Sequence, residues 1–239
     1  MFTVALIGAD GAGKTTIGRR LEQTLPVPAK YVYMGVNLDS SNHMLPTTRL
    51  IHSLKRAFGA KADTGGPPDP NQAPPSPQRL AWRIGACLKA SLGLVVRISE
   101  EWFRQALAWY YLIRGNVVVF DRHFYADYYA YDVAQNNNHK TLRMRIHGWM
   151  LEHLYPKPDL VIFLDAPAEV LFARKREGTL AALEHRRQEY LQMCSVVAHF
   201  AVVDASRSQD EVALAVTEVI ESFRRPRNRK MVEVENASS

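Results

Sequence analysis

The chain has 239 residues, of which 47% are hydrophobic and 23% are charged, and its formal net charge is +6. This length and composition fit one medium-sized α/β domain with insertions, and the positive charge suits an anionic substrate. No uncharged apolar run approaches the roughly eighteen residues of a membrane span, and the apolar start lacks the basic flank of a secretory signal. The two cysteines, Cys87 and Cys194, lack zinc or redox spacing, so we expect them to be buried in a cytoplasmic protein.

A glycine-rich phosphate loop follows the first apolar run. Residues 2–7 read as a strand, and residues 8–15 have the Gly-x4-Gly-Lys-Thr pattern, directly before a helix that ends near Leu25. The backbone N–H groups of such a loop and the positive end of the helix bind polyphosphate. The predicted ATP site therefore comprises Asp10, Gly11, Ala12, Gly13, Lys14, Thr15 and Thr16.

Three positions in this loop have separate expected roles. The Lys14 ammonium meets the β- and γ-phosphates, and the Thr15 hydroxyl is placed to ligate Mg²⁺. Asp10 is unusual, because a carboxylate beside triphosphate is unfavourable unless it faces a metal-bound water or a hydroxyl of a second substrate. The sequence therefore indicates that two substrates meet at this loop.

Four further apolar runs, separated by helical stretches, follow the first strand. Their residues are apolar on both faces, which indicates a parallel sheet covered by helices on both sides. The sequence thus predicts a three-layer α/β/α domain with a five-stranded parallel sheet. The further strands are expected at residues 30–34, 116–120, 160–164 and 200–203.

Residues 60–78 contain six prolines and two glycines, and cannot sustain a helix or a central strand. We expect a flexible insertion there, followed by a long helix over about residues 78–114 with a break near Gly93. The single domain is expected to span residues 1–223. The arginine-rich residues 224–239 are expected to form a basic, disordered tail rather than a nucleic-acid contact.

Asp121 and Arg122 directly follow the third strand, at the edge where ligands of parallel sheets bind. The carboxylate can hold Mg²⁺ or take the acceptor's proton, and the guanidinium can hold an anionic acceptor group with two parallel hydrogen bonds. A surface Asp–Arg pair is the alternative. Part of the aromatic stretch that follows is expected to pack in the core, and Tyr125 is a candidate to line a planar ligand.

A basic segment, residues 172–187, follows the fourth strand. Catalysis of phosphoryl transfer rests mainly on positioning and positive charge, so a basic flap that closes over the γ-phosphate has a clear role. A solvated basic helix face is the alternative. With Arg174 and Arg176 from this flap, the candidate catalytic residues are Lys14, Asp121, Arg122, Arg174 and Arg176, and the candidate metal ligands are Thr15 and Asp121.

The order and spacing of these motifs resemble the thymidylate kinase family of nucleoside monophosphate kinases. The resemblance covers residues 1–35 and 115–222, and implies a P-loop NTPase (nucleotide kinase) fold. It rests on the Asp10 form of the phosphate loop, the Asp121–Arg122 pair, the strand and turn over residues 158–165, the residues Glu184, Arg187 and Tyr190, and the run Val203–Ser206.

The same resemblance implies roles for individual residues. Ala205 would contact the adenine of ATP through its backbone, and Asp204 beside it is a further candidate ATP-binding residue. Asp10 would face a hydroxyl of the acceptor sugar, and Arg122 would bind the acceptor phosphate. The flap arginines would bind the transferred phosphoryl group. Since Gly11 stands where some members have an arginine, the chain resembles the bacterial type, which supplies arginine from the flap.

The half of the chain that would bind the acceptor departs from the family pattern. The family usually has Arg-Glu-Pro-Gly after its second strand, whereas residues 33–37 read Tyr-Met-Gly-Val-Asn and lack the arginine. The family's helix before the third strand carries an aromatic residue four positions before an arginine. Here the nearest arginine, Arg97, lies about one turn early and has Gly93 four positions before it. Arg97 is therefore only a candidate acceptor contact.

The leading interpretation is a cytoplasmic kinase, most like a thymidylate kinase, that uses ATP and Mg²⁺ to phosphorylate a nucleoside monophosphate. One alternative is a divergent kinase whose acceptor is a nucleoside, a sugar phosphate or a lipid-linked glycan precursor. Another is a regulatory nucleotide-binding switch, which the missing Asn-Lys-x-Asp guanine signature disfavours. Nucleic acid is not an expected partner, and a homodimer is left open.

Overall fold

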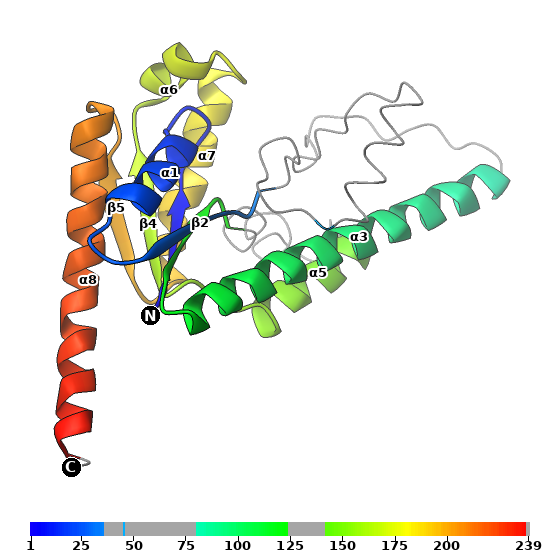
Figure 1. Ribbon diagram of the computed structural model, residues 1–239. Helices are drawn as coiled ribbons and strands as arrows, with labels where there is room; N and C mark the ends of the chain where they lie inside the picture. The colour runs from blue at the N-terminus through cyan, green and yellow to red at the C-terminus, as the bar shows by residue number, and fades with distance from the viewer. Residues whose placement is uncertain (36–44, 46–79, 124–141, 238–239) are drawn as a thin grey trace.

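The computed structural model describes residues 1–35, 45, 80–123 and 142–237, without the side chains of residues 80–94, 143 and 226–237 (Figure 1). The insertion predicted at 60–78 and the candidate Tyr125 lie outside these residues. Within the described helices, no stretch is long and apolar enough to cross a membrane.

The five predicted strands form one parallel sheet with the order β2-β3-β1-β4-β5. Every expected strand is present, and its bounds shift by no more than one residue at either end. The observed strands are β1 (Thr3–Ile7), β2 (Ala29–Tyr33), β3 (Val117–Asp121), β4 (Leu160–Asp165) and β5 (Phe200–Asp204). The sheet confirms the predicted fold class.

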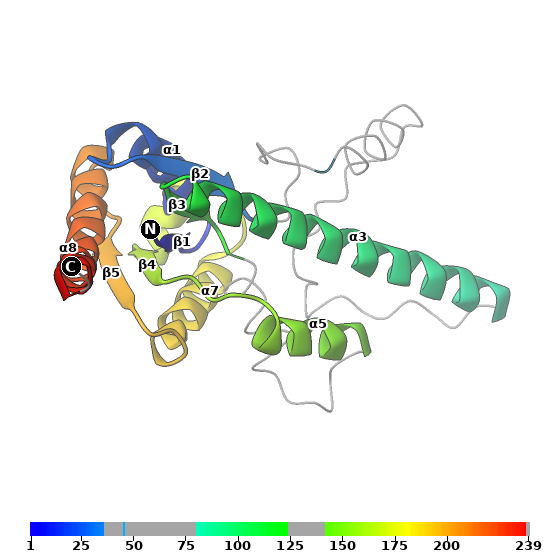
Figure 2. The ribbon, with the colours of Figure 1, turned by 60° about the horizontal axis from the view of Figure 1, so that its bottom comes forward.

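Helices cover both faces of this sheet, as Figure 2 shows. They are α1 (Lys14–Thr24), α3 (Leu80–Ile113), α5 (Leu142–His153), α6 (Ala168–Lys175), α7 (Leu180–Gln192) and α8 (Gln209–Ala237), with a short 3-10 turn, η4, at Met193–Ser195. Figure 1 shows that α3 extends well past the sheet.

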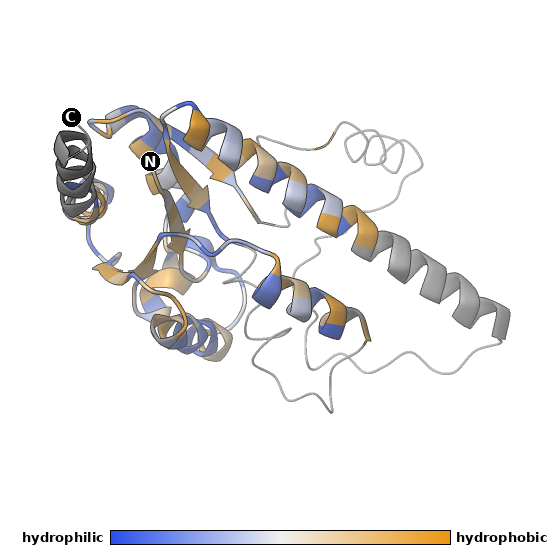
Figure 3. Ribbon diagram, turned by 90° about the horizontal axis from the view of Figure 1, so that it is seen from below, coloured by the Kyte–Doolittle hydropathy of each residue, from blue (hydrophilic) through white to orange (hydrophobic). Residues whose placement is uncertain are grey.

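Alternate residues of the inner strands belong to two separate apolar cores. Val4 and Leu6 of β1 pack with residues of α1, α6 and α8, whereas Ala5 and Ile7 pack with residues of α3 and α5. The period of two places neighbouring side chains on opposite faces of a strand. In Figure 3 the strands between the two helical layers are largely hydrophobic, while α5 and the coloured part of α3 carry both hydrophobic and hydrophilic residues. Two buried faces explain why the strand sequences are apolar without alternation.

Three sequence expectations differ from the structure. α3 passes through Gly93 without the expected break, because one glycine costs only about 1 kcal/mol in a helix interior. α8 continues to Ala237, although disorder was expected from residue 224; arginine, lysine and glutamate are good helix formers despite Pro226. Cys194 is exposed in η4 rather than buried, because the chain there turns at the protein surface.

Candidate functional site

The strands end together in a row of polar groups at one edge of the sheet. The strand register aligns Tyr33 of β2 and Leu6 of β1 with Asp121 of β3. On the other side, Asp165 of β4 lies beside Asp204 of β5. Because the phosphate loop begins directly after β1, parallel pairing brings the loop and these carboxylates to the same edge.

The phosphate loop is shaped by three glycines with left-handed backbone conformations. Gly8, Gly11 and Gly13 have φ angles of 150°, 91° and 85°. α1 begins immediately after Gly13, so its first N–H groups point into the loop. Thr16 is exposed in this first turn, and Ala12 is buried. The loop thus has the curved backbone and the helix N-terminus that bind phosphate.

Lys14 folds back over the loop that precedes it. Its Nζ donates hydrogen bonds to the carbonyl oxygens of Gly8 and Ala9, at 2.7 and 2.8 Å. The side chain is buried, so its ammonium lies within the curve of the loop and not out in solvent. This position concentrates positive charge where the sequence predicted the β- and γ-phosphates.

Asp121 and Thr15 form the candidate metal site. Thr15 Oγ1 and Tyr31 Oη donate hydrogen bonds to Asp121 Oδ2, at 2.5 and 2.7 Å. Asp121 is fully buried, and its Oδ1 has no hydrogen-bond partner among the described residues. A buried carboxylate oxygen without a donor needs compensation, and a hydroxyl and a carboxylate are hard oxygen ligands. The pair therefore fits Mg²⁺. Burial and the Asp121 charge also raise the pKa of Tyr31.

Asp10 lies between two cations from different parts of the site. Its Oδ1 is 2.5 Å from Arg122 Nη2 and 3.8 Å from Lys175 Nζ, which also pairs with Glu177 at 2.8 Å. Burial opposes ionisation of Asp10, but the charges of Arg122, Lys14 and Lys175 outweigh it and lower the pKa of this carboxyl. Asp10 thus links the residue after β3 to the end of α6. Sequence reasoning did not single out Lys175.

Arg122 has an unusual backbone conformation. Its φ of 61° lies in the left-handed region, which is uncommon for a residue with a side chain. Its N–H donates to Leu6 O at 3.1 Å, so the strained residue is tied directly to β1. Such strain persists only where surrounding contacts fix it, and it is concentrated at functional sites.

The predicted flap consists of the end of α6, a turn and the start of α7. Arg176 ends α6 with a φ of 52° and Gly178 follows with a φ of 76°. Thr179 begins α7, and its side chain accepts the N–H of Ala182. Arg176 itself is exposed. A break with two left-handed residues separates the two helices, which the sequence analysis treated as one basic segment.

Arg174 points to the loop after β5. Its guanidinium donates to the carbonyl oxygens of Ala205 at 2.7 Å, Ser206 at 3.1 Å and Arg207 at 3.4 Å. From the sequence, this loop was expected at the adenine and Arg174 at the transferred phosphate. In the structure Arg174 instead binds this loop, and so it lies beside the expected base site. Contact between Arg174 and the phosphate stays a prediction.

The loop after β5 is held by β4 and by its own side chains. Ala205 N donates to Asp165 O at 2.6 Å, and Asp204 Oδ1 accepts the N–H of Ser206 at 2.9 Å. Arg187 of α7 forms a bidentate pair with Asp165, at 2.5 and 2.9 Å. The hydrogen bonds that Arg187 donates to the Asp165 carboxylate raise the pKa of Arg187. This pair fixes α7 over the end of β4.

α6 also explains why a glycine is required at position 11. A Cβ on Gly11 would lie 2.6 Å from the carbonyl oxygen of Leu171, a backbone atom of α6. A Cβ on Gly13 would meet no atom within 4 Å. An arginine at position 11 would therefore push α6 away from the phosphate loop.

The acceptor side contains one residue that sequence reasoning missed. Arg97 is half-buried on α3. About two turns further along the same helix, Arg104 is buried, and its Nη1 donates to Gly35 O at 2.7 Å, directly after β2. The structure thus brings Arg104 to the end of β2. Arg104 lies seven residues after Arg97, on the same helical face, and this spacing could have identified it as a second candidate from the sequence.

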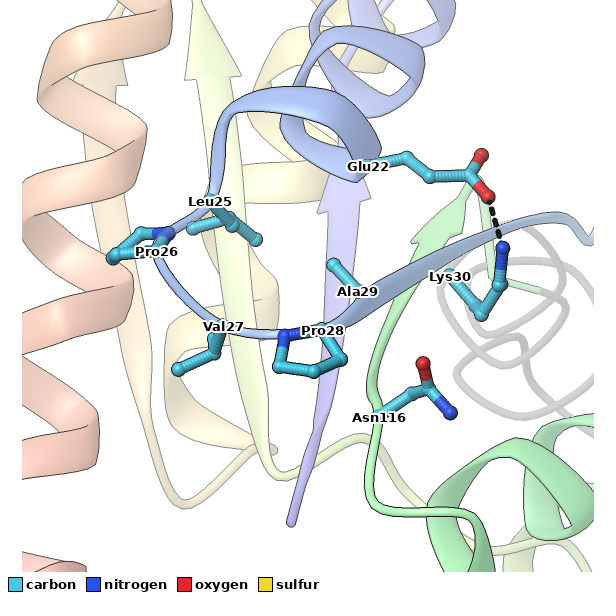
Figure 4. Close-up of a pocket in the computed structure, with 8 residues that line it drawn as sticks. All are labelled: Glu22, Leu25, Pro26, Val27, Pro28, Ala29, Lys30 and Asn116. Carbon is cyan, nitrogen blue, oxygen red and sulfur yellow. Dashed lines mark hydrogen bonds and ion pairs between the residues drawn. The ribbon is translucent and has the colours of Figure 1, made fainter.

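A surface pocket lies at the opposite edge of the sheet, around the start of β2 (Figure 4). Lys30 and Glu22 form an ion pair of 3.0 Å in its lining, and Asn116 lies on the same side of the pocket as Lys30. The remaining lining residues are Leu25, Pro26, Val27, Pro28 and Ala29. Since it lies at the amino ends of the strands, this pocket is separate from the phosphate-loop edge.

Known proteins resemble the chain over nearly its whole length. The chain is 29% identical over 224 residues to "Probable thymidylate kinase 1" of Saccharolobus solfataricus, covering 91% of this chain and 96% of that protein. It is 34% identical over 116 residues to "Probable thymidylate kinase" of Archaeoglobus fulgidus, covering 46% and 55% of the two chains. No family model matches the sequence.

A solved structure has the same fold. Thymidylate kinase from Candida albicans superposes with a TM-score of 0.59 and 20% identity, over 93% of this chain and 92% of that one. This likeness agrees with the five-stranded parallel sheet of the chain. The chain therefore has the fold of a thymidylate kinase, and over nine-tenths of its length it is similar in sequence to a protein named as a probable thymidylate kinase.

Proposed function

We propose that the protein transfers the γ-phosphate of ATP to thymidylate (dTMP). The observation that carries this proposal is the meeting of two sets of groups at one edge of the sheet. Lys14 and the loop glycines supply an anion site, and the Asp10–Arg122 pair lies beside it at 2.5 Å. A switch protein would need only the first set. The names of the curated relatives support dTMP as the acceptor.

The chain's own residues supply the donor half of the reaction. The loop N–H groups and Lys14 bind and orient the β- and γ-phosphates, and stabilise the charge that develops on the transferred group. Thr15 and Asp121 would hold Mg²⁺, which neutralises phosphate charge when it is bound. Ala205 and Asp204 would bind the adenine, with Arg174 holding the loop that carries them.

Arg122 and Asp10 would bind the acceptor. A guanidinium holds a phosphate with two parallel hydrogen bonds, and the phosphate would replace Asp10 as the partner of Arg122. The released carboxylate then faces the acceptor and can accept a hydrogen bond from a sugar hydroxyl. Lys175, which is also near Asp10, and Arg176 are the flap cations that would approach the transferred phosphoryl group.

A coupled assay of ADP release tests this proposal. The purified chain would be supplied with ATP and Mg²⁺, and with dTMP, other nucleoside monophosphates, nucleosides or phosphosugars as separate acceptors. We expect dTMP to raise ADP release by orders of magnitude over ATP alone, because closure that excludes water requires both substrates. Faster turnover of another acceptor would assign a divergent kinase. Brisk hydrolysis without any acceptor would instead favour the switch.

Self-association and a cytoplasmic location stay predictions of the proposed function. Among the described residues, α3 exposes Trp109 and Tyr110, and α5 exposes Trp149. These are the side chains that a second copy would cover. Light scattering during gel filtration would give the mass, and a monomer at micromolar concentration would argue against a stable homodimer.

A further inference from the structure

Buried polar side chains form a cluster on α3, near the ends of β2 and β3. Glu100, Glu101, Arg104 and Gln105 are all buried. Arg104 Nη2 lies 3.6 Å from Glu100 Oε2, while Glu101 accepts hydrogen bonds from Tyr155 and His147. Burying an ion pair is costly compared with apolar packing, so such a pair is weak evidence for stability. Its contacts point to another role.

The Arg104–Glu100 pair holds the main chain at two points beyond β2. Arg104 Nη1 donates to Gly35 O at 2.7 Å, and Glu100 Oε1 accepts the N–H of Leu45 at 3.1 Å. Arg104 is only 3% exposed, so its hydrogen bond is shielded from water and is stronger than a surface contact. The position of Gly35 is therefore set by α3.

Gly35 in turn packs against the acceptor arginine. A Cβ on Gly35 would lie 2.6 Å from Arg122 Cδ, and would also collide with the Tyr33 hydroxyl. The backbone of Gly35 therefore lies against the aliphatic stem of Arg122. Met34 N, one residue earlier, donates to Asp121 O at 3.0 Å, which ties the same stretch to the end of β3.

These contacts form a continuous series from α3 to the phosphate loop. Arg104 holds Gly35, Gly35 packs on Arg122, and Arg122 pairs with Asp10. The Arg122 side chain is long and partly exposed, so it could adopt many conformations if the Gly35 backbone did not pack against its methylene groups. We propose that Arg104 is a positioning residue, which orients Arg122 for the acceptor by fixing Gly35. The part that concerns the acceptor rests on the proposed function.

Kinetics with dTMP test this role. Arg104→Met should lower kcat/KM for dTMP about tenfold, mainly through KM, and change the KM for ATP less than about twofold. Arg114→Met, an exposed arginine just beyond the same helix, is the matched control and should retain wild-type values. Arg104→Lys should restore part of the loss. If the KM values for dTMP and ATP rise together, the role is general stability and the proposal fails.

A double-mutant cycle separates action through Arg122 from an independent effect. In an Arg122→Lys background, Arg104→Met should cost less than about twofold, because the guanidinium that it positions is already absent. An equal loss in both backgrounds would overturn the proposal. The Arg104→Met variant leaves the Glu100 carboxylate without its partner and could therefore fail to fold. In that case the double variant Glu100→Gln with Arg104→Met, which removes both charges, takes the place of Arg104→Met in the cycle.

A substrate-free measurement distinguishes this inference from the proposed function. In protein labelled with ¹⁵N-arginine, the Nε–H signal of Arg122 can be assigned by its loss in Arg122→Lys. Arg104→Met should broaden this signal or accelerate its exchange with water, whereas Arg114→Met should leave it unchanged. An unchanged Arg122 signal in folded Arg104→Met refutes the positioning role. If dTMP is not phosphorylated at all, the proposed function fails while this result still stands.

Discussion

The phosphate loop and the acceptor side of the sheet hold their polar groups in different ways. The loop is made by eight consecutive residues and the first turn of α1, and its binding groups are mostly backbone N–H. On the acceptor side, Arg122 contacts Gly35 from beyond β2 and Asp10 from the phosphate loop, while Arg104 of α3 holds Gly35.

This difference bears on how each region can change. The phosphate loop binds through its backbone, which must adopt one conformation. It therefore needs glycines at fixed positions, and a lysine at a fixed distance from them. A side-chain site depends on which helix packs against which strand end, so a cation can come from another element. The buried Arg104 lies at the strand end where the sequence lacks the family's arginine, although it holds the main chain there.

The largest effect is expected in the phosphate loop. Lys14→Ala should leave the protein folded but lower kcat about a hundred- to a thousandfold, because the ammonium meets charge that grows in the transition state. Steady-state ADP release and circular dichroism would measure both quantities. Lys30→Ala, at the opposite edge of the sheet, is the control and should keep wild-type turnover. Near-normal kcat in folded Lys14→Ala would contradict the donor site.

The acceptor side should carry a pH dependence of stability. Burial lowers the pKa of His123, next to Arg122, to about 3 from its ordinary 6.5. The unfolded chain binds this proton below about pH 6.5 and the folded protein does not until about pH 3, so the free energy of unfolding falls as pH decreases through this window. Between pH 6.5 and 4.5 the loss from this group is about 2–3 kcal/mol.

Urea unfolding at pH 7 and pH 4.5 would measure this loss. His123→Gln should show a smaller difference between the two pH values than the wild type does, because glutamine does not titrate. His185→Gln, which alters an exposed residue of α7, should retain the wild-type difference. An unchanged difference in His123→Gln would show that the acid sensitivity arises elsewhere.

Arg122→Lys tests the two-substrate division directly. Lysine keeps the charge but loses the planar fork, so kcat/KM for dTMP should fall about ten- to a hundredfold. The KM for ATP should change less than about twofold, since Arg122 pairs with the Asp10 side chain and packs against Gly35. A comparable rise in the KM for ATP would place Arg122 on the donor side.

The smallest effect is expected at Arg174. Because its guanidinium binds three carbonyl groups of the loop after β5, Arg174→Met should raise the KM for ATP about three- to tenfold and change kcat less than about twofold. Arg176→Met, the next flap arginine, provides the comparison and should act mainly on kcat. If Arg174→Met lowers kcat more than it raises KM, its guanidinium acts on the transferred phosphate, as the sequence suggested.

The sheet and the phosphate loop could be predicted because their signals are local. Residues 116–120 and 160–164 are apolar on both faces, and each becomes a buried strand flanked by helices. The placement of Asp121 beside Thr15 followed from parallel strands that end at one edge, and the two are joined by a hydrogen bond of 2.5 Å. A strand that is apolar on both faces must lie between two layers of helices, so the local pattern already indicates its place in the fold.

The cations around the site could not be assigned in the same way. Arg174, Lys175 and Arg176 are neighbours in sequence, but Arg174 points to the loop after β5 and Lys175 to Asp10. Helical geometry sends successive residues in different directions, about 100° apart, and the end of α6 determines which of them reaches the phosphate loop. A basic run therefore indicates that cations are present without indicating their partners.

The sequence by itself determined the five strands, the glycine-rich loop between β1 and α1 and the carboxylate at the end of β3. These features depend on side-chain periodicity and on glycines within a few residues of one another. Only the tertiary structure decided that Arg104 holds Gly35 against Arg122, and that Asp10 lies between Arg122 and Lys175. Arg104 and Gly35 are 69 residues apart, and no local pattern specifies a contact made by packing a long helix against the end of a strand.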